Sequence, residues 1–193
     1  MPRSNASQSE QEDAILKAAA EEVALVGLGR ASLDVIAKQA GVSRRTLYRR
    51  FPTRDTLITE LGRRTFDAAM NRLRTVAIDS GPNEAAVAAF SEGLRLLTTE
   101  PVMRRFLRLD SDFTAVAGAY HEVQTLLSSA SAAMAKALRA AGATMPDADL
   151  LAVAELHIRL ASSLAQVPTP VLDVTDDDAV RAYARQHLAA LVW

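Results

Sequence analysis

Helical spacing of apolar residues recurs along nearly the whole chain, and this pattern limits the possible folds more than any other feature. Apolar side chains return every three or four residues, as at Ile15, Ala19, Val23 and Val26. No segment sustains the period-two alternation of a half-buried strand. Aromatic residues make up only 5% of the chain, which favours a core of helices packed on helices. The sequence therefore predicts an all-α protein.

Glycine, proline and capping residues divide this pattern into about nine helices. The first ends at the GLG of 27–29, and Ser32 and Ser43 are expected to cap two short helices that end near Gly41 and Phe51. The fourth helix is expected from Pro52 to before Gly81, the fifth through 87–97 to a stop at Pro101, and the sixth over 102–106. The seventh is expected from Val116 through Met134, the eighth at about 147–166 and the ninth at about 176–192. We predict an N-terminal three-helix head at 9–55 and a helical body at 56–193, with the long fourth helix leading from one to the other.

Positive charge gathers in the head. The net charge is −1, yet residues 1–74 hold thirteen Lys and Arg against nine Asp and Glu, whereas the remainder holds nine against fourteen. Five arginines and no acidic residue fall within residues 40–54. A locally basic head on an acidic body is expected when only the head meets a polyanion.

Residues 32–51 predict a helix-turn-helix. Two helices of barely two turns are unstable alone, so they must share a core with a third, and the first helix can supply it. Gly41 permits the left-handed backbone that redirects the chain between them. Ile36, Leu47 and Phe51 supply the inward apolar side chains. In such units the N-terminal part of the second helix enters the major groove of DNA.

The outward face of that second helix carries Arg44, Arg45, Tyr48 and Arg49, with Thr46 beside them. Guanidinium groups pair bidentately with guanine or with phosphate. A run of arginines is often only a solvated helix face. The cap, the glycine turn and the inward apolar residues favour DNA contact instead.

The segments IAKQAGVS (36–43) and TLYRRFPTRDTL (46–57), with the preceding helix and its glycine break, resemble the TetR family of transcriptional regulators. The resemblance covers about residues 10–60, and the body agrees with the family only in the number and length of its helices. It implies an N-terminal DNA-reading unit followed by a variable helical body that binds a small effector and dimerises.

By position in this resemblance, Ser43 caps the recognition helix, and the three residues after it contact the bases or their surroundings. Tyr48 and Arg54 match positions that contact the DNA backbone. Arg45 departs from the family, which very often has glycine there, and Arg50 replaces a frequent histidine or tyrosine, so it is either a phosphate contact or a solvated side chain. The predicted DNA-binding residues are Ser32, Ser43, Arg44, Arg45, Thr46, Tyr48, Arg49 and Arg54.

The last two expected helices have unusually wide apolar faces, which suggests contact beyond their own core. We predict that they pair with their copies in a four-helix, two-fold interface, and the alternative is a hairpin buried within one chain. The candidate interface residues are Leu151, Ala154, Ile158, Ala161, Val180, Ala184, His187, Leu188 and Leu191.

The interior of the body is expected to hold an effector pocket, although each of its candidates is also an ordinary core residue. Tyr120 and His157 stand out because a polar group on an apolar stripe needs a partner. The candidates are Phe66, Met70, Phe90, Met103, Phe106, Phe113, Tyr120 and His157. An apolar or amphipathic effector fits this set.

Other functions find little support in the sequence. The chain has no cysteine, its three histidines lack metal-ligand spacing, and the acidic run at 173–178 precedes a helix without the calcium-loop pattern. We expect no cofactor, no metal and no catalysis. No apolar run approaches the ~20 residues of a membrane span, and the polar N-terminus lacks the centre of a secretion signal, so a cytoplasmic location is expected.

These features predict a ligand-responsive repressor that binds a palindromic operator as a homodimer and is released by a small apolar or amphipathic effector. An activator on the same fold is the nearest alternative. A helical small-molecule-binding protein or enzyme that retains the head as a scaffold is the alternative from another class.

Overall fold

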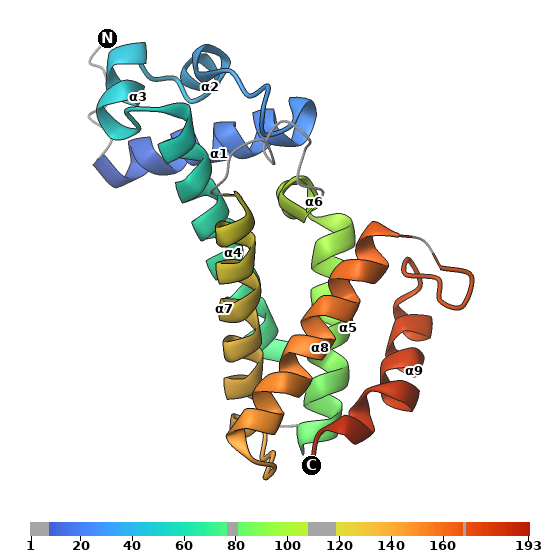
Figure 1. Cartoon of the computed structure of the whole chain (residues 1–193). Coiled ribbons are helices and arrows are strands. Elements are labelled where there is room, and N and C mark those ends of the chain that lie inside the picture. The colour runs from blue at the N-terminus through green and yellow to red at the C-terminus, as the bar shows by residue number, and fades with distance from the viewer. Residues whose placement is uncertain (1–7, 77–80, 108–118, 168) are drawn as a thin grey trace.

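The computed structural model describes residues 8–76, 81–107, 119–167 and 169–193, apart from the side chains of 119–123. Within these ranges the chain forms nine α-helices and no strand beyond an isolated bridge, which confirms the predicted all-α class (Figure 1). The helices are α1 (Gln8–Val26), α2 (Leu33–Gln39), α3 (Arg44–Arg50), α4 (Arg54–Val76), α5 (Gly81–Thr99), α6 (Pro101–Leu107), α7 (Ala119–Ala140), α8 (Asp147–Gln166) and α9 (Asp177–His187), followed by a 3-10 turn at Ala189–Leu191.

A small core holds the head together. Ile15 and Val23 of α1, Ile36 of α2 and Leu47 of α3 are fully buried against one another, and Phe51 closes the end of α3 with 6% of its surface exposed. The two short helices therefore gain their stability from the burial of apolar surface on α1, as the sequence predicts.

The long helix α4 begins in the head and continues into the body. Its first two turns place Leu57, Ile58 and Leu61 in the core that also contains Ile15 and Leu47. The head's core thus extends into α4, past the boundary expected after residue 55. Below this point α4 packs against α5, as Figure 1 shows.

Ion pairs fix α4 against α1. Arg64 of α4 donates to Glu12 (2.6 Å) and Asp13 of α1, and its Nε donates to Glu60 at 2.9 Å. Hydrogen bonds from Arg63 and then Arg64 lower the pKa of Glu60 to about 2. The carboxylate therefore stays charged through the physiological range, and its contribution to stability is lost only as the pH falls from about 4.5 through about 2.

The body is built around α5, with α8 and α9 packed against different parts of it and α7 paired with α8 (Figure 1). The last helix is shorter than predicted, because α9 ends at His187 instead of near 192. The chain turns at Leu188, and the Trp193 carbonyl accepts hydrogen bonds from the backbone N–H groups of Thr144 (2.6 Å) and Met145 (3.0 Å). The Trp193 contacts join residues distant in the sequence.

Gly41 separates α2 from α3 with φ at +68°, in the left-handed region. Because a Cβ there would meet no atom within 4 Å, a substitution acts through the backbone alone. Gly41→Ala should lower the free energy of unfolding by ~1 kcal/mol, and Gly41→Asn by less, since asparagine tolerates this conformation. Urea denaturation monitored by circular dichroism measures both. Equal losses would contradict the backbone explanation.

Candidate nucleic-acid interface and cavity

Helix α3 is oriented by a cap at one end and an apolar anchor in its middle. The Ser43 hydroxyl accepts a hydrogen bond from the Thr46 backbone N–H at 3.1 Å, which confirms the predicted cap. The Thr46 hydroxyl lies 2.9 Å from Ser43 Oγ, so the two side chains satisfy each other. Since Leu47 is fully buried, the opposite face of the helix is presented to solvent.

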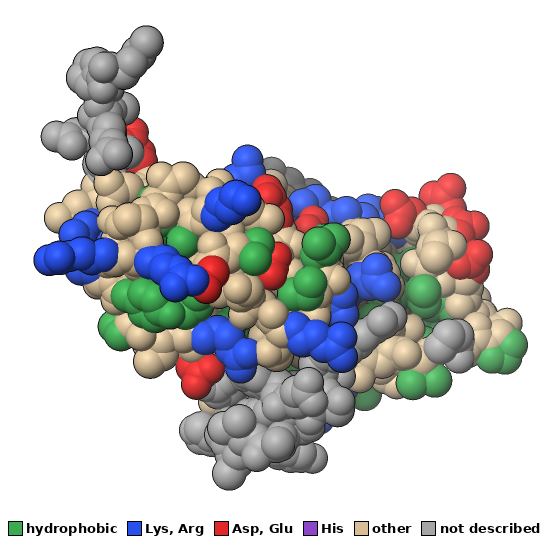
Figure 2. All heavy atoms as spheres, turned by 90° about the horizontal axis from the view of Figure 1, so that it is seen from above, with side chains coloured by type: hydrophobic (Ala, Val, Ile, Leu, Met, Phe, Trp, Pro, Cys, Tyr) green, Lys and Arg blue, Asp and Glu red, His purple; other side chains and the backbone are tan. Residues whose placement is uncertain are grey.

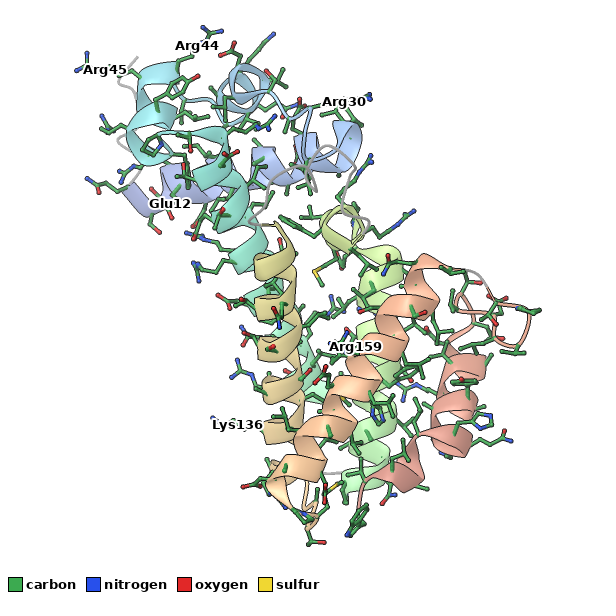
Figure 3. The ribbon with its side chains drawn as sticks, viewed as in Figure 1. Glu12, Arg30, Arg44, Arg45, Lys136 and Arg159 are labelled. Carbon is green, nitrogen blue, oxygen red and sulfur yellow. The ribbon has the colours of Figure 1, made fainter. Side chains whose placement is uncertain are left out.

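Arg44 and Arg45, at the start of α3, point away from the body (Figure 3). Arg44 and Arg45 lie at the outer end of the head in Figure 3, far from Arg159 on α8. Arg44 forms an ion pair with Asp34 of α2, and 69% of its side chain remains exposed. Figure 2, which looks down on the head, shows Lys and Arg side chains spread over this end of the molecule, with acidic side chains beside some of them. This surface can approach a polyanion without rearrangement of the fold.

The other predicted DNA contacts lie around this face. Arg49 is exposed and Tyr48 is 47% exposed, both on α3. The exposed Arg54, at the start of α4, donates to the Gly29 carbonyl. Arg50 is half-buried and donates to Gln8 Oε1 at 3.2 Å, so it is tied to α1 and is not simply solvated.

Ser32 precedes α2 as predicted, but among the described residues its hydroxyl makes no capping hydrogen bond. Its backbone N–H instead donates to Glu22 Oε1 at 3.3 Å. Glu22 is 6% exposed on α1 and was missed by the sequence analysis. This carboxylate ties α1 to the start of the helix-turn-helix.

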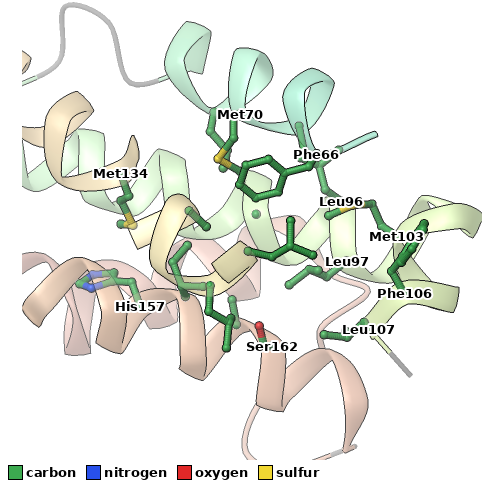
Figure 4. Close-up of a pocket in the computed structure, with 18 of the residues that line it drawn as sticks. Phe66, Met70, Leu96, Leu97, Met103, Phe106, Leu107, Met134, His157 and Ser162 are labelled. Atoms are coloured by element: carbon green, nitrogen blue, oxygen red, sulfur yellow. The ribbon is translucent and has the colours of Figure 1, made fainter. Parts of the chain in front are cut away.

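A cavity of about 250 Å³ lies in the body between α4, α5, α6, α7 and α8. Figure 4 shows Phe66 and Met70 of α4 on one side, and Met134 and His157 near one end. Six of the eight predicted pocket residues line it: Phe66, Met70, Phe90, Met103, Phe106 and His157. Phe113 and the side chain of Tyr120 lie outside the described residues.

Several lining residues were not among the candidates, including Gly62, Gly93, Ser162 and Gln166. The glycines carry no side chain that a periodic pattern could reveal. Ser162 and Gln166 follow Ile158 at i, i+4 spacing along one face of α8, and this spacing was the available signal.

His157 is the most deeply buried polar group of the cavity wall, at 1% exposed. Its Nδ1 lies 2.7 Å from the Val153 carbonyl, whereas its Nε2 is buried without a hydrogen-bond partner among the described residues. The edge of the ring meets Phe90, with the ring centroids 6.2 Å apart. Burial lowers the pKa of the imidazole, so it is neutral near pH 7.

Helix α6 connects the cavity to the head. Met103, Phe106 and Leu107 line the cavity, and Phe106 also packs against the core of the head. Arg105 of the same helix donates to the Ala24 carbonyl at 2.9 Å, near the end of α1. An ideal Cβ at Gly62 would lie only 2.9 Å from Phe106 Cζ, so the absence of a side chain allows this ring to approach α4 closely.

The predicted interface residues are mostly buried within the chain itself, which corrects the expectation that they form an exposed surface. Five are buried: Ala154, Ala161, Val180, Ala184 and Leu188. The apolar stripe of α9 packs chiefly against α5 instead of facing a second copy, because that contact buries the stripe in the body's own core. Ile158 lines the cavity and Leu191 is half-buried, and only Leu151 and His187 are exposed.

Two classes of feature are not found in the part of the chain that the structure describes. It contains no group of three or more His, Cys, Asp or Glu side chains placed to hold a metal ion. None of its helices combines the length and hydropathy that a membrane crossing requires.

Residues 15–61 match the family model described as bacterial regulatory proteins, tetR family. No protein of curated function matches the sequence significantly. The whole chain is similar in fold to solved regulators. One is a TetR-family transcriptional regulator from Streptomyces coelicolor (23% identity, TM-score 0.64, covering 96% of this chain and 97% of that one). Another is a putative TetR-family regulator from Mesorhizobium loti (15%, 0.69, 97% and 99%).

A third is the TetR family repressor AlkX from a Dietzia strain, implicated in biodegradation of n-alkanes (18% identity, TM-score 0.66, 96% of each chain). At these identities the solved structures show the shared fold, and the match of the head adds the family signature. Residues 15–61 thus carry the signature of the tetR family of bacterial regulatory proteins, and the whole chain shares the fold of solved regulators of that family.

Proposed function

We propose that this protein is a ligand-responsive transcriptional regulator that reads operator DNA with α3. The observation that carries the proposal is the pair Arg44 and Arg45 on the outer end of the head, on the face opposite the buried Leu47 (Figure 3). The N-terminal turns of such a helix fit the major groove, where guanidinium groups pair with guanine or phosphate. Ser43, Thr46, Tyr48, Arg49 and Arg54 surround these two arginines, as DNA-backbone or base contacts.

A homodimer would place two copies of α3 on the half-sites of a palindrome. The exposed side of α8 supports such pairing, since Ala152, Leu156, Ser163 and Val167 follow one another at helical spacing and are all exposed. Leu156 is 50% and Val167 65% exposed. Their small and apolar side chains suit close packing against a second helix. This stripe lies on a different side of α8 from the buried residues first considered.

The cavity is the proposed effector site, and repression by competition with polymerase for a promoter is the proposed mode of regulation. The structurally similar AlkX is named a repressor, which favours repression over activation. An enzyme is less well supported, because among the described cavity residues His157 is the only ionisable side chain.

Helix α6 and the start of α4 supply the coupling between cavity and head. An occupant that shifts Phe106 acts on Gly62 at the point where α4 leaves the head. In the proposed mechanism the two heads of the dimer adopt one arrangement that fits DNA and another that does not. The ligand needs only to bind unequally to these two arrangements in order to change DNA affinity.

Removal of the α3 guanidiniums tests DNA recognition. Arg45→Ala should weaken binding to a duplex selected from a randomised pool by about tenfold or more, and should relax base preference at one position of each half-site. Arg44→Ala should act similarly. Arg181→Ala, which also removes an exposed arginine but lies on α9, is the control and should bind normally. Normal DNA affinity in both α3 variants would contradict the proposal. If a variant instead keeps its base preference and its DNA affinity depends less steeply on salt concentration, the arginine that was removed contacts phosphate.

A charge on the exposed stripe of α8 tests the dimer. Leu156→Glu should weaken self-association by about tenfold or more, because it would bury an unpaired carboxylate. Sedimentation velocity over a dilution series measures the change. Leu25→Glu on α1, where leucine is 78% exposed, is the matched control and should dimerise normally. A dimer of unchanged affinity in Leu156→Glu would show that α8 does not form the interface.

A methyl group at Gly62 tests the coupling. Gly62→Ala should displace Phe106 and lower DNA affinity about threefold or more in the absence of ligand. Gly93→Ala is the matched control, because this second helical glycine of the cavity wall has room for a Cβ, whose nearest neighbour is Leu73 Cδ2 at 3.9 Å. Fluorescence anisotropy with labelled DNA reads both variants. If Phe106→Leu does not restore affinity to the Gly62→Ala protein, the ring is not the coupling element.

A further inference from the structure

The cavity wall carries almost no polarity. None of the described lining residues is Asp, Glu, Lys or Arg, and the surface is otherwise built from aliphatic, aromatic, methionine and glycine residues. The polar side chains are His157, Ser162 and Gln166, all on α8. With a rise of 1.5 Å per residue, these three positions span roughly 13 Å along the helix axis. The cavity is thus an apolar chamber whose polar side chains all come from one helix.

The one ionisable group of this wall is held in a neutral form that cannot attract an anion. The Val153 carbonyl only accepts hydrogen bonds, so the 2.7 Å contact requires Nδ1 of His157 to carry the proton. Nε2 is then left with a lone pair and no proton. Burial opposes protonation of the ring, which keeps its pKa below the usual value. A ligand carboxylate near this ring would therefore face the lone pair of Nε2 instead of a positive charge.

The other two polar side chains do not supply a positive charge either. Gln166 is exposed and donates to the Ser162 carbonyl at 3.1 Å, so one of its amide protons is already engaged. The Ser162 hydroxyl is a neutral group on a half-buried residue. An ion placed in this chamber would lose its hydration without gaining a partner of opposite charge, which costs far more than the transfer of a neutral group.

We propose that the cavity selects an uncharged, hydrocarbon-rich ligand and rejects the carboxylate of the same chain length. This inference rests on the proposed function and narrows it, because it excludes ionised fatty acids as effectors and retains alkanes, alcohols, ethers and other neutral lipids of similar size.

Calorimetric titration of the full-length protein with three eight-carbon probes tests the selection. At neutral pH, n-octanol and its isomer heptyl methyl ether should bind with affinities within about tenfold of each other, and octanoate at least tenfold more weakly than either. Octanoate binding within threefold of n-octanol would overturn the proposal. Failure of both neutral probes to bind would also overturn it, while DNA binding by α3, measured separately, would still decide the proposed function.

A pair of variants at Ser162 tests the physical cause. Ser162→Lys adds a cation to the wall, whereas Ser162→Met adds a neutral side chain of similar length. The affinity ratio of octanoate to n-octanol should rise at least tenfold in Ser162→Lys relative to Ser162→Met, because the ligand carboxylate would gain a partner. An unchanged ratio would show that the octanoate carboxylate does not enter the chamber, and would overturn the proposal.

The tautomer of His157 gives a readout that needs no variant, so the proposal stays testable if Ser162→Lys does not fold. Long-range nitrogen–proton correlation spectra distinguish the two ring nitrogens of a histidine. A neutral ring protonated at Nδ1 is expected near pH 7, and a cationic ring would overturn the exclusion of carboxylates.

Discussion

One uninterrupted helix, α4, packs in the core of the head and also lines the cavity of the body, and the relation between head and body depends on it. Leu57 and Leu61 pack among the helices of the head, and Phe66 and Met70 line the cavity five and nine residues after Leu61. A helix of this length resists bending, since every backbone hydrogen bond would have to adjust. A change in the packing around Phe66 therefore alters the direction in which α4 presents the head. Phe106, wedged against Gly62, lies where such a change begins.

The features of the head that the sequence predicted correctly are local. Ser43 caps the backbone N–H three residues further on, and Gly41 forms a left-handed turn. Leu47 and Phe51 are apolar residues four positions apart. Each of these features determines the geometry of only one or two helical turns. The tie between Ser32 and Glu22 was missed, because it joins residues ten positions apart through a polar side chain that no apolar pattern marks. Local signals thus defined α3 and its outward face, whereas the contacts that brace it required coordinates.

The body shows where periodicity stops being informative. The apolar stripes of α8 and α9 indicated how much of each helix is buried, but a second chain and the chain's own α5 would satisfy such a stripe equally well. Val180 and Ala184 are covered by their own chain. The hydrogen bonds from the backbone of Thr144 and Met145 to the Trp193 carbonyl, beyond the end of α9, were equally hidden. In both cases the deciding partner is remote in the sequence.

The exposed arginines explain why a modest ligand would suffice for control. The ion pair between Arg44 and Asp34 is solvent-exposed, and such pairs contribute about 0–1 kcal/mol, so breaking it to contact a phosphate or a guanine costs little. In the proposed dimer, operator affinity would then come from many such contacts made together by two heads. When binding depends on simultaneous contacts, a small rotation of α4 removes several of them at once. The cavity therefore needs to favour one direction of α4 only slightly, and an uncharged ligand that gains its affinity from apolar burial is able to do so.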